Sequence, residues 1–362
     1  MAKKNTEGNL VDISSNTQVI KLYNKKGRVL RIVALVLSII FLVAGAGTLL
    51  IYYSTVGQTN YRAAKKISDS EVKDPNALKS TDLIDSDEVL NVMLFGEDDR
   101  QGEEYGRTDT MILLSIDNRH QKLKLTSFQR DTYVYIPGHD TYDKINASYT
   151  LGGADLSIKT IESNFGIKID KYAIVDFDGF KNIINTLGGV EMEVTEDEIE
   201  YINYQMYKNG QTEDRHTIKA PAGMVKLDGQ EALWYARNRG LSKGEDGNEI
   251  GLDGDDWDRT SRQRKLLTKL VSDMKGADLV KIVQIATSIG PMITTNLTKN
   301  DITTLLSNAP KYLNYEVVQN YVPKENLWYY NNDTSAGSVI AITDMQAQRV
   351  ALAEFIYEDL AR

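Results

Sequence analysis

The sequence contains no cysteine and only three histidines, which excludes several kinds of site from the start. Without cysteine there are no disulfides, no zinc–thiolate sites and no cysteine nucleophile. The histidines show no metal-ligand spacing, and H-E-x-x-H, P-loop and G-x-S-x-G motifs are all missing. The chain therefore lacks the usual signatures of zinc proteases, P-loop NTPases and α/β-hydrolases.

Negative charge exceeds positive charge outside the N-terminus. Residues 1–31 carry seven Lys and Arg against two Asp and Glu, whereas the rest of the chain carries 35 against 49. Affinity for nucleic acid depends on neutralisation of phosphates by Lys and Arg, so an acidic body repels it. The sequence therefore predicts no nucleic-acid partner.

One long hydrophobic run is present. Residues 32–53, IVALVLSIIFLVAGAGTLLIYY, carry no charge and are long enough as a helix to cross about 30 Å of hydrocarbon. The run exceeds the apolar core of a cleavable signal peptide, and the basic residues before it predict a cytoplasmic N-terminus. We expect a single-pass protein of the cell membrane. Its parts are a cytoplasmic arm at 1–31, a transmembrane helix at 32–53, an extracellular linker at 54–86 and an extracellular domain at 87–362.

Strand-like and helical patterns alternate in that domain. Strands are expected at 88–96, 110–117, 122–129, 132–137, 171–178 and 190–195. Helices are expected at 154–166, 180–187, 229–239, 260–276, 296–313 and 342–362. The alternation predicts an α/β fold, with α-β-α layers around a central mixed sheet.

An acidic connection joins the first two expected strands. Asp98 and Asp109 stand at its two ends, and oxygen donors without His or Cys suit Mg²⁺. Arg107 shares the direction of Asp109 if the stretch between them is extended. A solvated acidic turn is the alternative explanation of this stretch.

A charged pair interrupts the next apolar run. Arg130 and Asp131 lie within SFQRDTYVYIP, where charge is unfavourable unless it is paired or binds a ligand. A local ion pair at a strand end is the alternative. Lys144 follows in DKINASYTLGG, before a Gly-Gly turn into a helix.

Five arginines flank a second acidic segment, which contains seven carboxylates and one lysine. They are Arg237 and Arg239 on one side, and Arg259, Arg262 and Arg264 on the other. Arginine forks near a helix N-terminus favour phosphate or pyrophosphate. Exposed ion pairs with the segment's carboxylates contribute only about 0–1 kcal/mol each and explain the grouping poorly. A phosphate site with the acidic segment as its flap is predicted.

These motifs together resemble the LytR–CpsA–Psr family of bacterial cell-envelope proteins. They are NVMLFGEDDR, GRTDTMILLSI, SFQRDT, KINASYTLGG, DFDGFKNIINTLGGVEMEV, LDGQEALWYARNR and DWDRTSRQR. The resemblance, which runs from about residue 88 to the C-terminus, implies a phosphotransferase. Such an enzyme moves an anionic glycopolymer (teichoic acid or capsule) from a polyprenyl pyrophosphate carrier to peptidoglycan and releases polyprenyl phosphate. A non-catalytic lipid-binding or regulatory protein and a pyrophosphatase are the alternatives.

The resemblance also implies roles for single residues. Asp98 and Asp109 match the family's metal-binding aspartates, and Arg107, Arg130 and Asp131 join them as the expected catalytic group. The expected pyrophosphate ligands are Arg107, Arg130, Lys144, Arg237, Arg239, Arg259, Arg262 and Gln263. The expected lining of the prenyl groove is Phe180, Ile183, Ile184 and Leu187. The sequence departs from the family pattern at Gln129, where proline is usual, and at Arg264, where glutamine is common.

Overall fold

The computed structural model describes residues 59–98, 105–214, 216–239, 242–243, 249–250 and 255–358. All of them belong to one unit of the chain, Thr55–Arg362. The predicted cytoplasmic arm and transmembrane helix lie outside the described residues, as does most of the acidic flap. None of the described helices combines the length and hydropathy that a membrane span requires.

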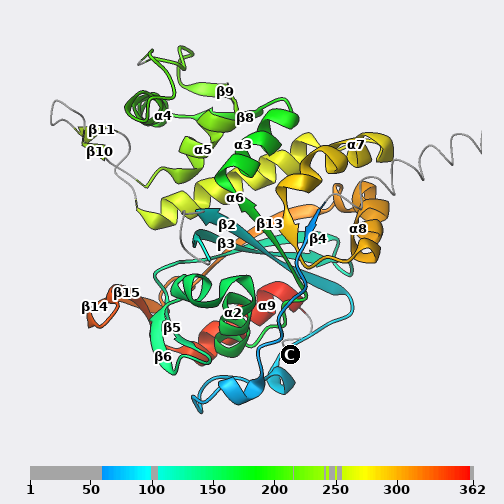
Figure 1. Cartoon of the computed structure of the whole chain (residues 1–362), viewed down its shortest axis with the longest axis vertical. Helices are drawn as coiled ribbons and strands as arrows, with labels where there is room; N and C mark the ends of the chain where they lie inside the picture. Colours follow the sequence, from blue (N-terminus) through cyan, green and yellow to red (C-terminus); the bar gives the residue numbers. More distant parts are fainter. Residues whose placement is uncertain are drawn as a thin grey trace, which may run out of the picture. The chain divides into compact units, whose positions relative to one another are not determined.

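A mixed seven-stranded sheet forms the middle layer (Figure 1). Its spatial order is β1 (Asn60–Tyr61), β12 (Thr294–Thr295), β7 (Lys171–Asp176), β2 (Val89–Asp98), β3 (Arg107–Asp117), β4 (Lys122–Phe128) and β13 (Glu316–Val322). β3 runs antiparallel to β2 and β4, while β7 is parallel to β2 and β13 is parallel to β4. The α/β class with a central mixed sheet is thereby confirmed.

Helices cover both faces of the sheet (Figure 1). One face packs against α2 (Ala147–Phe165) and α9 (Met345–Tyr357). The other face lies under α3 (Phe177–Thr186), α5 (Gly229–Arg237) and α6 (Asp256–Asp273). Because side chains alternate along a strand, Met93 and Phe95 enter the first core while Leu94 and Gly96 face the second layer.

Further elements surround these layers. The other helices of the described residues are α4 (Glu196–Lys208), α7 (Leu279–Ile289) and α8 (Lys299–Tyr312), with 3-10 turns at Asp69–Glu71, Ser80–Asp82 and Gly290–Met292. Two-stranded pairs are formed by β5 (Tyr133–Ile136) with β6 (Thr141–Lys144), β8 (Val190–Val194) with β9 (Gly223–Leu227), β10 (Ser242–Lys243) with β11 (Glu249–Ile250), and β14 (Trp328–Thr334) with β15 (Gly337–Ile342). The strands expected at 132–137 and 190–195 thus form β5 and β8, outside the central sheet.

Residues 59–86 pack on the domain, in contrast to the linker expected there. Asn60–Tyr61 form the edge strand β1, beside β12. Val72 is buried, and the amide of Leu78 donates to the carbonyl of Ser163 at 2.7 Å. Short edge strands and isolated turns carry no periodic pattern, which explains why a linker was expected here.

Helix α6 begins at Asp256, four residues before the expected start. The side chain of Asp255 accepts from the amides of Trp257 and Asp258, and Asp258 accepts from the amide of Asp255 in return. Acidic residues are favoured at this end of a helix by capping and by the helix dipole. The carboxylates assigned to the flap therefore start the helix, and Arg259 lies in its first turn.

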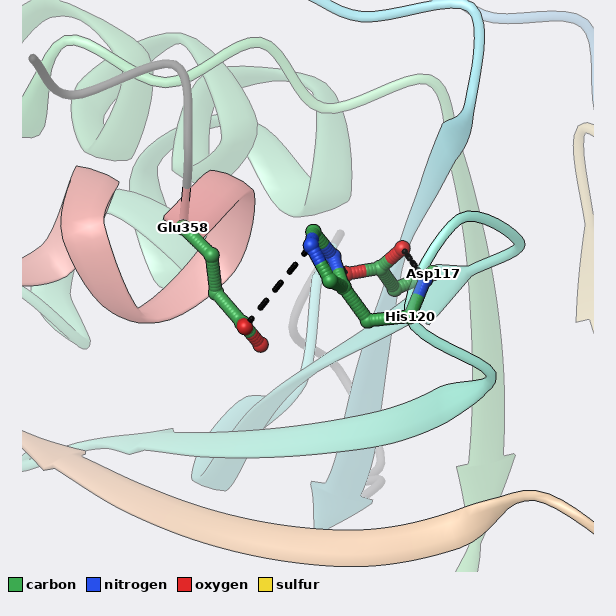
Figure 2. A group of neighbouring side chains, drawn as sticks. All are labelled: Asp117, His120 and Glu358. Carbon is green, nitrogen blue, oxygen red and sulfur yellow. Dashed lines mark hydrogen bonds and ion pairs between the residues drawn. The ribbon is translucent and has the colours of Figure 1, made fainter.

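A buried lysine ties the C-terminal helix to the sheet. The Lys124 ammonium lies 2.7 Å from Asp117 and 2.9 Å from Glu358, and it donates to the carbonyl of Ile356 at 2.8 Å. His120 contacts the same two carboxylates (Figure 2). Asp117, His120 and Glu358 are spaced like metal ligands, but the ammonium already sits between the carboxylates. We interpret this group as a structural ion-pair network.

Replacing Lys124 by Met should destabilise the protein by about 3–5 kcal/mol, because it leaves the buried Asp117 carboxylate without its cation. Lys122→Met is the matched control, since Lys122 contacts Glu358 but is partly exposed, and about 1 kcal/mol or less is expected. Urea unfolding at pH 7 measures both changes. Equal effects of the two substitutions would contradict the network.

The same network predicts a pH dependence. Burial opposes ionisation of Asp117, but hydrogen bonds from Lys124 and His120 outweigh it and lower the pKa of this carboxyl below 3.8. The resulting stability is complete above pH 3.8 and is lost as the pH falls through the lowered pKa. Urea unfolding over a pH series from neutral to strongly acidic should show a smaller acid loss in Lys124→Met than in the wild type.

Candidate functional site

A bulge near the end of β2 and the start of β3 sets the direction of Asp109. Gly96 pairs with Thr110 and Glu97 pairs with Thr108, so Asp109 has no partner on β2. Bulges of this kind re-aim a side chain and are common beside active sites. At the next position Asp98 pairs with Arg107, which places three of the predicted residues at one end of two adjacent strands.

Three arginines converge on Asp109. Nη1 of Arg130 donates to Oδ1 at 2.7 Å, and Nη2 of Arg239 donates to Oδ2. Nη1 of Arg259 lies 3.5 Å from Oδ2, and Nη2 donates to the Asp109 carbonyl at 2.9 Å. The arginines come from the turn after β4, the segment directly after α5 and the first turn of α6. The fold thus joins residues that are up to 150 positions apart in the chain.

We call Arg130, Arg239 and Arg259 the arginine cluster. Two further carboxylates contact it. Asp256 lies 2.9 Å from Arg259 and 3.4 Å from Arg130. Asp131 lies 3.3 Å from Arg130 and 2.8 Å from the ammonium of Lys144. Sequence reasoning missed Asp256, because it stood in a stretch interpreted as flap. Its position directly after an acidic N-cap residue was the available signal.

Burial and charge oppose each other within the cluster. Burial disfavours the ionised form of Asp109, but Arg259, Arg239 and Arg130 outweigh it and lower the pKa of this carboxyl. At Asp256 burial prevails over the same arginines and raises the pKa. Burial also lowers the pKa of Arg259 to about 10, which leaves the guanidinium charged at neutral pH.

Arg259 retains unused hydrogen-bonding capacity. Its side chain is 1% exposed, and its Nε and Nη1 make no hydrogen bond with the described residues. Buried donors without partners are unfavourable, and buried charges are normally paired and hydrogen-bonded. The cluster is therefore suited to an anion with several acceptor oxygens.

Arg237 and Gln263, two more of the predicted pyrophosphate ligands, have contacts other than Asp109. The guanidinium of Arg237 lies over the rings of Phe177 and Trp234, at 4.4 and 5.1 Å. Nε2 of Gln263 donates to the carbonyl of Ala236 at 3.4 Å, while its Oε1 makes no hydrogen bond with the described residues.

Arg262 has a different set of neighbours. Its Nε donates to Glu198 at 2.7 Å, and its Nη1 donates to the carbonyl of Asn238 at 3.2 Å. These buried contacts connect α6 with α4 and with the end of α5. They give Arg262 partners other than Asp109, and the phosphate contact expected of it stays a prediction.

An apolar cavity of about 220 Å³ lies between the sheet and helices α3, α5 and α6. Its lining includes Phe180, Ile183 and Ile184 from α3, Leu266, Leu267 and Leu270 from α6, and Leu94 and Ile112 from the sheet. Arg237 and Gln263 belong to the same lining, whereas Leu187 is the C-cap residue of α3 and lies outside it. Along α6 the site therefore changes from charged at Arg259 to apolar at Leu270.

The cavity is smaller than the 300–1,000 Å³ typical of ligand pockets. Phe180, Ile183 and Leu267 are only partly buried, so these side chains have room to move apart. A long apolar chain would need such a movement to enter between the sheet and the helices.

If the cavity holds the prenyl chain that the family resemblance implies, filling the cavity should weaken binding of that chain. Ile183→Trp places an indole in it and is expected to weaken binding of a short-chain polyprenyl pyrophosphate at least about tenfold, by overpacking. Asn182→Trp adds the same bulk on the exposed side of α3 and should leave binding unchanged. Isothermal titration calorimetry measures both. Unchanged affinity in Ile183→Trp would place the lipid elsewhere.

Comparisons with known proteins agree with this arrangement. Residues 50–350 match the model of the LytR_cpsA_psr family. The polyisoprenyl-teichoic acid–peptidoglycan teichoic acid transferase TagU of Oceanobacillus iheyensis is 30% identical over 307 residues, which cover 82% of this chain and 87% of TagU. TagV of Bacillus subtilis, a transferase of the same description, is 34% identical over 195 residues, which cover 53% of this chain and 45% of TagV.

A solved structure has the same fold. TagT of Bacillus subtilis with bound octaprenyl pyrophosphate lipid superposes with a TM-score of 0.54 at 22% identity, covering 80% of this chain and 99% of that one. At this identity the likeness concerns the fold alone.

Proposed function

Because the chain belongs to the LytR–CpsA–Psr family, we propose that it transfers an anionic glycopolymer from a polyprenyl pyrophosphate carrier to peptidoglycan. The relatives named above are teichoic acid transferases, and TagT holds a polyprenyl pyrophosphate lipid. The observation that carries the proposal is the placement of the arginine cluster next to the apolar cavity. A pyrophosphate with a prenyl chain has the charge and the hydrocarbon that these two parts accept.

The site holds two parts of the donor, its prenyl chain and its pyrophosphate. Its prenyl chain enters the cavity along α3 and α6, past Arg237 and Gln263. The pyrophosphate lies against Arg130, Arg239 and Arg259, where it takes over hydrogen bonds that these arginines otherwise donate to carboxylates. Bidentate arginine contacts fix the orientation of phosphate oxygens as well as their position.

Transfer breaks the bond between the lipid phosphate and the phosphorus nearer the sugar. A hydroxyl oxygen of peptidoglycan attacks that phosphorus, and polyprenyl phosphate leaves with the electron pair of the broken bond. The arginines stabilise the charge that grows on the leaving phosphate, a type of electrostatic stabilisation that is strong in a site shielded from water.

The proton of the attacking hydroxyl needs an acceptor. The lowered pKa of Asp109 makes it a weak base, which favours a role in holding charge over a role in taking the proton. Asp131 is the second candidate and contacts both Arg130 and Lys144. If the transfer rate of Asp131→Asn is unchanged, solvent is the proton acceptor.

Asp98 and Asp109 would be the ligands of a hard divalent cation, which requires the arginines to turn from Asp109 to the pyrophosphate. Both offer oxygen donors from adjacent strand ends, and the lowered pKa keeps Asp109 ionised, as a metal ligand must be. Mg²⁺ bound there would neutralise phosphate oxygens and support departure of the lipid phosphate. Magnesium dependence, the extracellular position and the membrane anchor all belong to the proposal.

The proposal is tested by following release of polyprenyl phosphate from a lipid-linked oligosaccharide donor. The full chain in detergent is incubated with the donor and Mg²⁺, with and without uncrosslinked peptidoglycan strands. We expect release only when the acceptor is present, together with sugar phosphate bound to it. Release without acceptor would indicate a pyrophosphatase, and donor binding without release would indicate a non-catalytic lipid-binding protein.

A further inference from the structure

Four aromatic rings form a continuous group beside the arginine cluster. We call Trp257, Tyr321, Trp328 and Tyr330 the aromatic surface. The indoles of Trp257 and Trp328 are stacked, with centroids 4.9 Å apart and planes 27° apart. Tyr321 meets Trp257 edge-on at 5.4 Å, and Tyr330 meets Trp328 edge-on at 5.0 Å. Two of the three tryptophans of the chain are therefore used here.

These rings are only partly covered by the protein. Tyr330 is 55% exposed, and the other three side chains are half-buried. Trp328 and Tyr330 lie two residues apart on β14 and so project from the same side of the strand, while Tyr329 projects from the opposite side. A contiguous exposed group of this kind marks a binding site more often than isolated exposed side chains do.

Two connections tie the aromatic surface to the arginine cluster. Trp257 directly follows Asp256, which contacts Arg130 and Arg259. The amide of Ile340, on the hairpin partner of β14, donates to the carbonyl of Asp131 at 2.8 Å. Figure 1 shows this hairpin and the first turn of α6 on the same side of the molecule. A ligand on the rings therefore lies next to the phosphate site.

The aromatic surface and the cavity occupy different sides of α6. Arg259, Gln263 and Leu266 follow one another at helical spacing toward the cavity. Trp257 lies on a face turned by roughly 150° from the middle of that row. In-line displacement places the attacking and leaving oxygens on opposite sides of the phosphorus. With the lipid phosphate leaving toward the cavity, the attacking hydroxyl arrives from outside it, where the rings are.

A buried cation lies behind the rings. The guanidinium of Arg264 is 5.9 Å from the centroid of Tyr321, and its Nε donates to Gln319 at 3.4 Å. No carboxylate among the described residues pairs with Arg264, which is 7% exposed. Its charge favours an acidic ligand over a neutral one. Peptidoglycan strands combine pyranose rings with lactyl and peptide carboxylates, which matches this combination of aromatic rings and positive charge.

We propose that the aromatic surface binds the acceptor glycan strand, with pyranose C–H faces stacked on Trp328 and Tyr330. The electron-rich face of an aromatic ring attracts the partly positive C–H groups of a sugar. This inference rests on the proposed transfer reaction and extends it by naming where the acceptor is held. Stacking tolerates different sugars, so it positions a repeating strand without requiring one particular residue.

Steady-state transfer by the full chain in detergent tests the proposal, with acceptor and donor varied separately. Trp328→Ala and Tyr330→Ala are each expected to raise the KM for acceptor strands about fivefold or more, and to leave the KM for donor within about twofold. Trp328→Phe should recover much of the acceptor affinity. Tyr329→Ala, similarly exposed on the other side of β14, is the matched control and should change neither KM.

Three outcomes would overturn the proposal. An unchanged acceptor KM in Trp328→Ala and Tyr330→Ala would show that the rings only pack the hairpin. A raised donor KM would assign the surface to the donor's own glycan. An equal effect of Tyr329→Ala would indicate a general disturbance of the hairpin.

Binding without catalysis separates this inference from the proposed function. Acceptor strands added without donor should quench the tryptophan fluorescence of the wild type, and Trp328→Ala should lose this change. If acceptor strands quench the fluorescence but no transfer occurs, the acceptor site on the aromatic surface is supported and the proposed transfer reaction is contradicted. If transfer occurs but substitution of the rings changes neither the fluorescence response nor the acceptor KM, only the proposed acceptor site is contradicted.

Discussion

Replacing Arg259 by Lys is expected to reduce glycopolymer transfer by about 10²–10³-fold, the effect of removing one preorganised donor from a developing oxyanion. Lysine keeps the positive charge but loses the planar fork with which Arg259 contacts Asp109 and Asp256. The loss should appear in kcat, because the arginine's unused donors are available to charge that develops during the reaction.

The control for this substitution is Arg119→Lys, which makes the same change at an exposed turn between β3 and β4. Thermal unfolding of Arg259→Lys is measured in parallel, because the side chain is 1% exposed and contributes to packing. Full transfer activity in a folded Arg259→Lys protein would show that the cluster does not act on the reacting phosphates.

Replacing Asp109 by Asn should separate donor binding from transfer. The neutral amide would not balance the charge of the three arginines, so the site gains positive charge and should bind a polyprenyl pyrophosphate as tightly as the wild type or more tightly. Transfer should nevertheless fall about 100-fold or more, because the proposed magnesium site loses an anionic ligand.

Calorimetry with the donor lipid and the transfer assay together measure this separation. Asp178→Asn is the control, since the Asp178 side chain is 83% exposed in a surface pair with Lys181 and should affect neither quantity. Weaker donor binding combined with normal turnover in Asp109→Asn would contradict the roles given to the arginine cluster and to Asp109.

The sequence predicted the central strands well, because their hydrophobic character is continuous. β2 and β3 carry apolar residues on both faces, one facing α2 and α9 and the other facing the cavity. β13 was missed: EVVQNYV is polar at several positions and lies at the sheet edge, where burial is incomplete. β1 and β12 have two residues each and are too short for any periodic signal.

Most residues of the site were predictable from the sequence, but their contacts with one another were not. Arg130, Arg239 and Arg259 were identified together with Asp109, and the structure brings all four into contact. Arg262 was expected to join Arg259 as a pyrophosphate ligand. Three residues along a helix turn a side chain by roughly 60°. That rotation is enough to exchange Asp109 of β3 for Glu198 of α4 as the partner, and only the tertiary structure defines those neighbours.

The central claim is that the phosphorus nearer the sugar moves to peptidoglycan while the lipid phosphate is released. A donor labelled separately in its two phosphates tests this claim most directly. With the full chain, Mg²⁺ and acceptor strands, label in the sugar phosphate should appear on peptidoglycan, and label in the lipid phosphate should appear only in polyprenyl phosphate. Label from the lipid phosphate on peptidoglycan, or sugar phosphate released into solution, would contradict the account.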